Sequence, residues 1–161
     1  MQCPGHPEAT LEGYILDCEI KLGQNVNRPA IVVCPGGGYV YCSPREAEPV
    51  ALRYAAAGFH AFILRYSVGD RAGGNAPLAQ AQWAVSLLRQ NAQQWHIDPQ
   101  KIAVCGFSAG GHLSVMVAEH PVTENLVGDV IGAVRSTPDA CILAYPVTTL
   151  GEGTFETMPR I

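Results

Sequence analysis

A serine between glycines is the residue of this chain best suited to chemistry. The pattern G-x-S-x-G is matched by Gly106-Phe107-Ser108-Ala109-Gly110, with the apolar run KIAVC before it and the segment GHLSVMVAEH after it. In that context the pattern indicates a sharp strand-to-helix turn, which holds a serine hydroxyl exposed for attack on a carbonyl carbon. We therefore predict that Ser108 is the nucleophile of an acyl-transfer reaction.

A glycine-rich loop is the second candidate. The apolar run AIVVC leads into Pro35, the three glycines Gly36 to Gly38, and Tyr39. Glycines place no side chain between the backbone amides and a ligand, so two N–H groups can converge on one oxygen. By itself the loop could equally be a flexible turn. Its position before a G-x-S-x-G turn favours an oxyanion hole, built from this loop and the amide of Ala109. Neither phosphate-binding glycine pattern is present.

The elements around these motifs predict an α/β fold. Short β-branched runs alternate with longer helical stripes, which is typical of a largely parallel sheet. The predicted strands are Tyr14 to Ile20, Ala30 to Cys34, His60 to Tyr66, Ile102 to Cys105 and Cys141 to Tyr145. The middle ones are apolar throughout, as expected of strands covered on both faces. The length of 161 residues fits a single domain over residues 1–161.

Two helices have recognisable starts. The segment Ser43-Pro44-Arg45-Glu46 has the form of a capping box, and predicts a helix that continues through Ala47 to Ala57 and ends at Gly58. A second helix is predicted from Pro77. Its apolar residues recur at spacings of three and four and should face the core: Leu78, Ala81, Val85, Leu88, Ala92 and Trp95.

Composition narrows the classes of partner. The chain is 48% hydrophobic and 15% charged, with a net charge of -4 and no run of Lys or Arg, which argues against nucleic acid. No signal-peptide pattern and no apolar run of about 18 residues is visible, so we expect no membrane association and a cytoplasmic location. The six cysteines form no CxxC pair, and we predict reduced, packed thiols. We expect neither a metal ion nor a cofactor.

Three segments together resemble the α/β-hydrolase superfamily: PGGGY, REAEPVALRYAAAGFHAFILRYSV and WHIDPQKIAVCGFSAGGHL. The resemblance is to its acetylesterase and carbohydrate-esterase-like branch, related to the hormone-sensitive-lipase group, and covers about residues 28–150. It implies a three-layer sandwich with Ser108 as nucleophile and Gly37, Gly38 and Ala109 as oxyanion donors. Tyr39 is a candidate substrate contact. Related lipases usually have His where Pro35 stands, a difference that favours the acetylesterase-like branch.

The rest of a catalytic triad is harder to find. In such enzymes the acid and then the histidine follow the serine along the chain. Only His112 and His120 follow Ser108, and we expect the first to pack within its helix and the second to cap that helix. We predict structural or turn roles for the other candidates: His6, His60, His96, Asp70, Asp98 and Asp139. Glu152 and Glu156 stand where a few α/β-hydrolases place the acid, but have no histidine to orient.

The resemblance implies further strands, an Asp and a His beyond Ile161. We therefore expect a truncated α/β-hydrolase domain that lacks its C-terminal strands and is weakly active or inactive. The leading function is serine carboxylic ester hydrolysis, with removal of a small or sugar-linked acyl group. The alternatives are a non-catalytic pseudo-hydrolase binding domain and a prolyl-oligopeptidase-like peptidase, whose elbow also ends in Gly-Gly like Gly110-Gly111. An open sheet edge at Cys141 to Tyr145 favours self-association.

Overall fold

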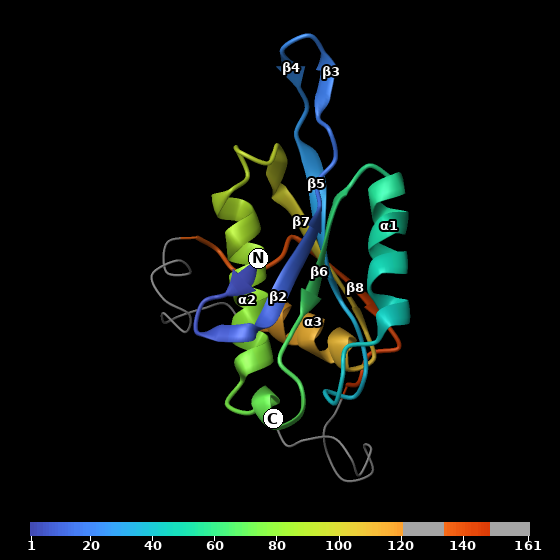
Figure 1. Ribbon diagram of the computed structural model, residues 1–161, viewed down its shortest axis with the longest axis vertical. Helices are drawn as coiled ribbons and strands as arrows, with labels where there is room; N and C mark the ends of the chain where they lie inside the picture. Colours follow the sequence, from blue (N-terminus) through green and yellow to red (C-terminus); the bar gives the residue numbers. More distant parts are fainter. Residues whose placement is uncertain (121–133, 149–161) are drawn as a thin grey trace.

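The computed structural model describes residues 1–120 and 134–148, which build one six-stranded sheet with helices on both faces (Figure 1). The strand order is β1-β2-β6-β5-β7-β8. The strands are β1 (Gln2–Cys3), β2 (His6–Tyr14), β5 (Arg28–Cys34), β6 (His60–Arg65), β7 (Ile97–Phe107) and β8 (Ala140–Ala144). The four from β6 to β8 in this order run parallel, while β1 and β2 pair antiparallel. The predicted largely parallel sheet is confirmed.

The central strands are apolar because both of their faces are covered. Successive residues of a strand point to opposite faces. Val32 of β5 is in register with Phe62 and Val104, and these three belong to one core cluster. The next residue, Val33, belongs to the cluster on the opposite face. A sheet buried on both sides therefore explains the unbroken apolar runs that the sequence shows.

The helices divide between the two faces (Figure 1). On one face α1 (Glu48–Ala56) packs through Ala51. On the other lie α2 (Ala76–Gln90) and α3 (Ala109–Glu119), which also contact each other. The predicted core stripe of α2 is confirmed at Ala81, Val85 and Leu88, which are fully buried. There are also two 3₁₀ turns in the described ranges, η1 (Pro44–Glu46) and η2 (Gly69–Ala72).

The first predicted strand was wrong in its position. The chain leaves the sheet at Tyr14, the last residue of β2, and Glu19–Lys21 (β3) then pairs with Gln24–Asn25 (β4) in a separate hairpin that projects from the fold (Figure 1). The antiparallel strand β2 is polar on one side and buries only Ala9 and Leu11 completely. The segment HPEATLEGY is half-exposed and has few apolar residues, so the more apolar run after it gave the stronger strand signal.

The predicted capping box was also wrong, although the end of its helix was right. Ser43 makes no side-chain cap hydrogen bond, residues 44–46 form η1, and α1 begins only at Glu48. The helix ends before Gly58, whose φ of 92° lies in the left-handed region that glycine tolerates. The Ser43 N–H and one oxygen of the Glu46 carboxylate bond instead to Gly36 of the glycine loop.

The last described strand is less buried than its sequence suggests. Among residues 1–120 and 134–148, β8 pairs only with β7, and Ile142 and Leu143 are 43% and 42% exposed. Cys141 is exposed as well, which corrects the expectation that it packs in a core, whereas the other cysteines are buried or half-buried and all six are free thiols. No helix within the described ranges is long and apolar enough to cross a membrane.

Candidate active site

Ser108 occupies a strained turn between β7 and α3. Its φ of 51° and ψ of -114° lie outside the regions that residues with a side chain normally adopt. Such strain costs on the order of 1–3 kcal/mol and persists only where surrounding contacts hold it. Here the Ser108 N–H donates to Ala144 O at 3.1 Å, and its carbonyl accepts from the N–H groups of His112 (3.0 Å) and Val147 (3.1 Å). The turn is therefore fixed from both sides, by α3 and by the end of β8.

Two glycines of the motif are required by close packing. A Cβ atom at Gly106 would collide with the Gly110 carbonyl and the Ser114 hydroxyl. A Cβ atom at Gly110 would collide with the carbonyl oxygens of Cys34 and Pro35. The turn at Ser108 is thus pressed against the end of β5, from which the glycine loop emerges.

The glycine loop lies directly against the serine. A Cβ atom on Gly36 would stand 2.8 Å from Phe107 O and 3.1 Å from Ser108 Cβ. The Gly36 N–H donates to Glu46, the Gly36 carbonyl accepts from Ser43 N–H, and the Gly37 carbonyl accepts from Val40 N–H. Within residues 1–120 and 134–148, the N–H groups of Gly37 and Gly38 have no hydrogen-bond acceptor. The N–H of Ala109 begins α3, where a helix leaves its first amides without intrahelical acceptors.

Tyr39 connects this loop to α3. Its side chain is fully buried, and its hydroxyl lies 2.8 Å from Nδ1 of His112. Burial raises the pKa of Tyr39, so its hydroxyl keeps the proton at neutral pH. Burial lowers the pKa of His112, which favours the neutral imidazole. A protonated phenol beside a neutral imidazole allows Tyr39 to donate to Nδ1.

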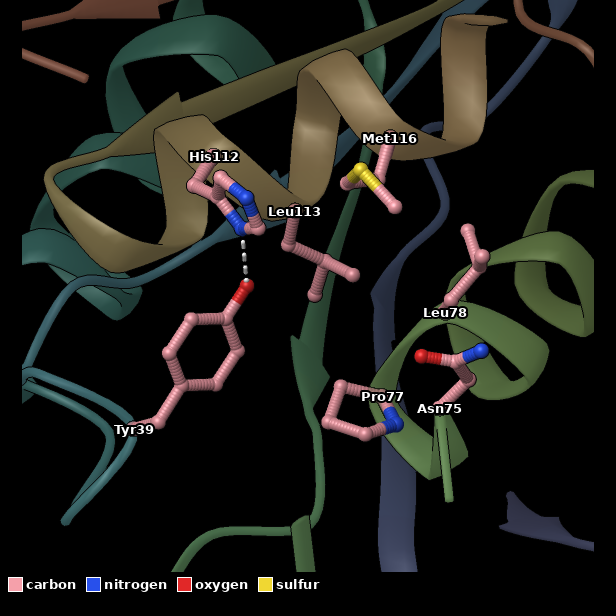
Figure 2. A pocket seen from close by; sticks show the side chains of 7 residues that line it. All are labelled: Tyr39, Asn75, Pro77, Leu78, His112, Leu113 and Met116. Carbon is pink, nitrogen blue, oxygen red and sulfur yellow. Dashed lines mark hydrogen bonds between the residues drawn. The ribbon is translucent and has the colours of Figure 1, made fainter. Parts of the chain in front are cut away.

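A cavity of about 140 Å³ opens beside this pair (Figure 2). It is lined by Tyr39, Asn75, Pro77, Leu78, His112, Leu113 and Met116. Positions 112 and 116 are one helical turn apart, so the cavity lies along one side of α3, and Ser108 is not among its lining residues. The packing partner of His112 is Tyr39 of the glycine loop, and no hydrogen bond of the described residues joins its ring to Ser108 Oγ. Its structural role, predicted from the sequence, stays a prediction.

The remaining candidates are held elsewhere. Within the described residues no hydrogen bond joins Ser108 Oγ to any of the five histidines, His112 included. His60 is buried at the start of β6, where its Nδ1 accepts from Leu16 N–H at 3.1 Å. Five further positions have local roles: His6 is 3.6 Å from Glu8, His96 directly precedes β7 and its carbonyl accepts from Arg28 N–H, His120 follows the last residue of α3, Asp98 Oδ1 accepts from Gln100 N–H, and Asp139 binds Arg89. Glu152 and Glu156 lie outside the described residues.

No cluster in the described ranges gathers three or more metal-ligating side chains of His, Cys, Asp or Glu. Asp70 lies in η2. The candidate site consists of backbone amides, a serine, and the Tyr39–His112 pair beside a small cavity.

A strained serine between a parallel strand and a helix is the arrangement of the α/β-hydrolases. The crystal structure of MGS-M1, an α/β-hydrolase enzyme from a Medee basin deep-sea metagenome library, superimposes with a TM-score of 0.77 at 44% identity and covers 92% of this chain. Residues 16–152 match the model of the BD-FAE family. The chain belongs to that family of hydrolases.

Two curated relatives carry names connected with xylan. Endo-1,4-beta-xylanase B of Butyrivibrio fibrisolvens is 35% identical over 135 residues, and acetylxylan esterase of Xylanibacter ruminicola is 30% identical over 134. Each match covers 81% of this chain but only 21% and 25% of the respective relative. The chain likewise spans 56% of MGS-M1. It thus corresponds to part of each of these proteins, and its family includes a named esterase.

Proposed function

We propose that the protein hydrolyses carboxylic esters through Ser108 and removes acetyl or a similarly small acyl group from a sugar or related alcohol. The observation that carries this proposal is the backbone of Ser108, with φ at 51° between β7 and α3 and with Gly36 packed against it. The relative named acetylxylan esterase supports an acetyl ester as the substrate class.

The reaction has two balanced halves. Ser108 Oγ attacks the carbonyl carbon, its proton passes through a base to the departing alcohol oxygen, and an acyl-serine ester forms. Water then attacks that ester and regenerates the serine while the carboxylic acid leaves. In both halves the carbonyl oxygen gains negative charge, and we assign the N–H groups of Gly37, Gly38 and Ala109 to hold it.

We assign the cavity beside the Tyr39–His112 pair to the acyl group, although Ser108 is not among its lining residues. The cavity has a volume of about 140 Å³, and its apolar side is formed by Pro77, Leu78, Leu113 and Met116. The Tyr39–His112 pair forms the polar side. Since a protein cavity of about 150 Å³ binds benzene, this space holds a group of about that size. We therefore keep Tyr39 as a substrate contact and expect long acyl chains to be excluded.

The alternatives are less well supported. Gly110-Gly111 also suits a peptidase of the prolyl-oligopeptidase kind, but the second glycine is explained by packing, since a Cβ atom there would stand 2.8 Å from Pro146 Cβ. A pseudo-hydrolase that binds without turnover remains the alternative for the 161-residue chain, because no histidine side chain among the described residues is hydrogen-bonded to Ser108 Oγ. Hydrolysis of p-nitrophenyl acetate separates binding from turnover.

Covalent labelling tests the proposal. A fluorophosphonate probe should modify Ser108 and no other serine, as mapped by peptide mass spectrometry. Labelling should be slow, because enzymes that lack triad members keep only about 10³- to 10⁴-fold acceleration over water. Ser108→Ala should abolish labelling, while Ser86→Ala, which removes a buried serine of α2, should not change it. Equal labelling of Ser108→Ala would disprove the assignment.

A further inference from the structure

We propose that Glu46 is a positioning residue of the oxyanion hole: its carboxylate fixes the Gly36 peptide and thereby orients the donor amides of the glycine loop. The inference rests on the proposed function and adds a residue to its machinery. Glu46 touches no reacting atom and acts only through the loop.

The carboxylate of Glu46 joins three separate segments of the chain. Its Oε2 accepts a hydrogen bond from the Gly36 N–H at 2.8 Å. Its Oε1 accepts from the hydroxyl of Tyr145, just after β8, at 2.6 Å. Hydrogen bonds to a charged acceptor are shorter and stronger than neutral ones. Glu46 therefore ties the loop after β5 both to η1 and to the segment that follows β8.

Peptide geometry carries this restraint to the donor amides. The Gly36 carbonyl accepts from Ser43 N–H at 2.9 Å, and the Gly37 carbonyl accepts from Val40 N–H at 2.9 Å. In a planar trans peptide the N–H points opposite to the carbonyl of the preceding residue. The fixed carbonyls of Gly36 and Gly37 therefore direct the N–H groups of Gly37 and Gly38 away from Ser43 and Val40. Glu46 fixes the peptide that precedes this pair.

The Ser43 N–H and the Glu46 carboxylate, which would bond to each other in a capping box, both bond to Gly36. In such a box the side chain of Glu46 would accept from the Ser43 N–H. Instead, the Ser43 N–H donates to the Gly36 carbonyl and the Glu46 carboxylate accepts from the Gly36 N–H. The Ser43 side chain caps nothing. The Ser43 N–H and the Glu46 carboxylate thus stabilise the glycine loop and do not cap the helix.

The charge of Glu46 should hinder the reaction, whereas its hydrogen bonds should help it. The position of a Gly36 Cβ atom is 2.8 Å from Glu46 Oε2 and 3.1 Å from Ser108 Cβ, so the carboxylate lies near the nucleophile. A negative charge there disfavours a second negative charge on the substrate oxygen. Any benefit of Glu46 must therefore come from its hydrogen bonds, which Gln can replace by accepting through its amide oxygen.

The test compares variants of the 161-residue chain by the rate constant for fluorophosphonate labelling of Ser108. Glu46→Ala should lower it about 10- to 100-fold, the cost expected when oxyanion donors are misplaced. Glu46→Gln should restore a rate near that of the original chain. Glu48→Ala is the matched control, because it also removes a carboxylate bonded to a tyrosine, Tyr14 at 2.7 Å, but Glu48 makes no hydrogen bond to the described glycine loop. It should not alter the rate.

Amide chemical shifts provide the second readout. In ¹H–¹⁵N spectra, Glu46→Ala should move the Gly36, Gly37 and Gly38 signals, and Glu46→Gln should leave the latter two near their original positions. If Glu46→Ala does not fold, Glu46→Asp, whose shorter side chain withdraws the carboxylate, replaces it in both measurements. Labelling of Glu46→Ala at the original rate would overturn the inference. If Ser108 itself is not labelled, the proposed function fails, and unchanged Gly37 and Gly38 signals would then refute the role of Glu46 separately.

Discussion

The hydroxyl of Tyr39 lies 2.8 Å from Nδ1 of His112, and this contact links the residue after the three glycines to α3, the helix that follows Ser108 (Figure 2). The two rings meet edge to face, with centroids 5.9 Å apart. Tyr39 is further fixed by its carbonyl, which accepts from Gly69 N–H at 2.7 Å. The pair is thus a rigid wall of the cavity as well as a candidate substrate contact.

We expect Tyr39→Phe to weaken both folding and substrate binding. The substitution leaves Nδ1 of His112 without its partner, and loss of such a hydrogen bond costs about 0.5–1.5 kcal/mol. Urea unfolding measures this loss, and KM for p-nitrophenyl acetate should rise if the hydroxyl contacts substrate. Tyr41→Phe is the control, because Tyr41 is in the same loop but 53% exposed. Equal stability and KM for Tyr39→Phe and the original chain would contradict both roles.

Stability should fall on acidification between about pH 7.5 and 5. Burial lowers the pKa of His112 and of His60 below their ordinary value of 6.5. Below 6.5 the unfolded chain therefore binds protons that the folded chain does not, and the free energy of unfolding decreases by at most about 1.4 kcal/mol per pH unit for each histidine. The loss ends as pH falls through the folded pKa.

His112→Asn tests this pH dependence, because Asn offers a polar group near the position of Nδ1 without titrating. Its free energy of unfolding should vary less with pH than that of the original chain. The pH range of the measurement ends at about pH 5, because carboxyl groups titrate below that pH. Among them, burial raises the pKa of Asp139, but hydrogen bonds from Ile102 N–H and Arg89 outweigh this and lower it overall. An identical pH profile in His112→Asn would refute the assignment to His112.

The sequence allowed the central strands and the turn at Ser108 to be predicted because their causes are local. A strand buried on both faces must be apolar throughout, as Val32 and Val33 show by packing into opposite clusters. Gly106 is likewise required by the turn itself, because a Cβ atom there would collide with Gly110 and Ser114. These patterns need no knowledge of distant partners, whereas the requirement for Gly110 comes from Cys34 and Pro35 at the end of β5.

The contacts of Glu46 and His112 could not be predicted from local patterns. Glu46 has the spacing of a capping residue, yet its partners are Gly36, ten residues earlier, and Tyr145, 99 residues later. Tertiary hydrogen bonds replaced the local ones. For His112, the helical pattern shows which side of α3 it occupies, but not whether a core or a cavity lies there. Tyr39 lies 73 residues before it.

We expect alanine at Gly106 or Gly110 to destabilise the fold strongly. Each added methyl group would collide with backbone carbonyl oxygens, which cannot move aside without breaking the turn. Overpacking typically costs about 1–3 kcal/mol, and rigid backbone neighbours place these sites at the upper end. Gly73→Ala is the control, since a Cβ atom there meets nothing within 4 Å. Thermal unfolding should show lower Tm values for the first two variants only. A Tm for Gly110→Ala equal to that of Gly73→Ala would contradict the packing.

Finally, we expect the 161-residue chain to self-associate through β8. Within the described residues this strand pairs only with β7, and its Ile142 and Leu143 are 43% and 42% exposed. An open apolar edge presents unpaired N–H and C=O groups that a second chain can pair with, whereas a lysine on such an edge opposes pairing. Sedimentation equilibrium at several concentrations should therefore reveal dimers or larger assemblies, and Leu143→Lys should weaken them.

Leu22→Lys is the control, because Leu22 is fully exposed in the β3–β4 turn, away from β8, and its replacement should leave association unchanged. A monomer at all concentrations, with a cooperative melt, would show that the edge is already protected.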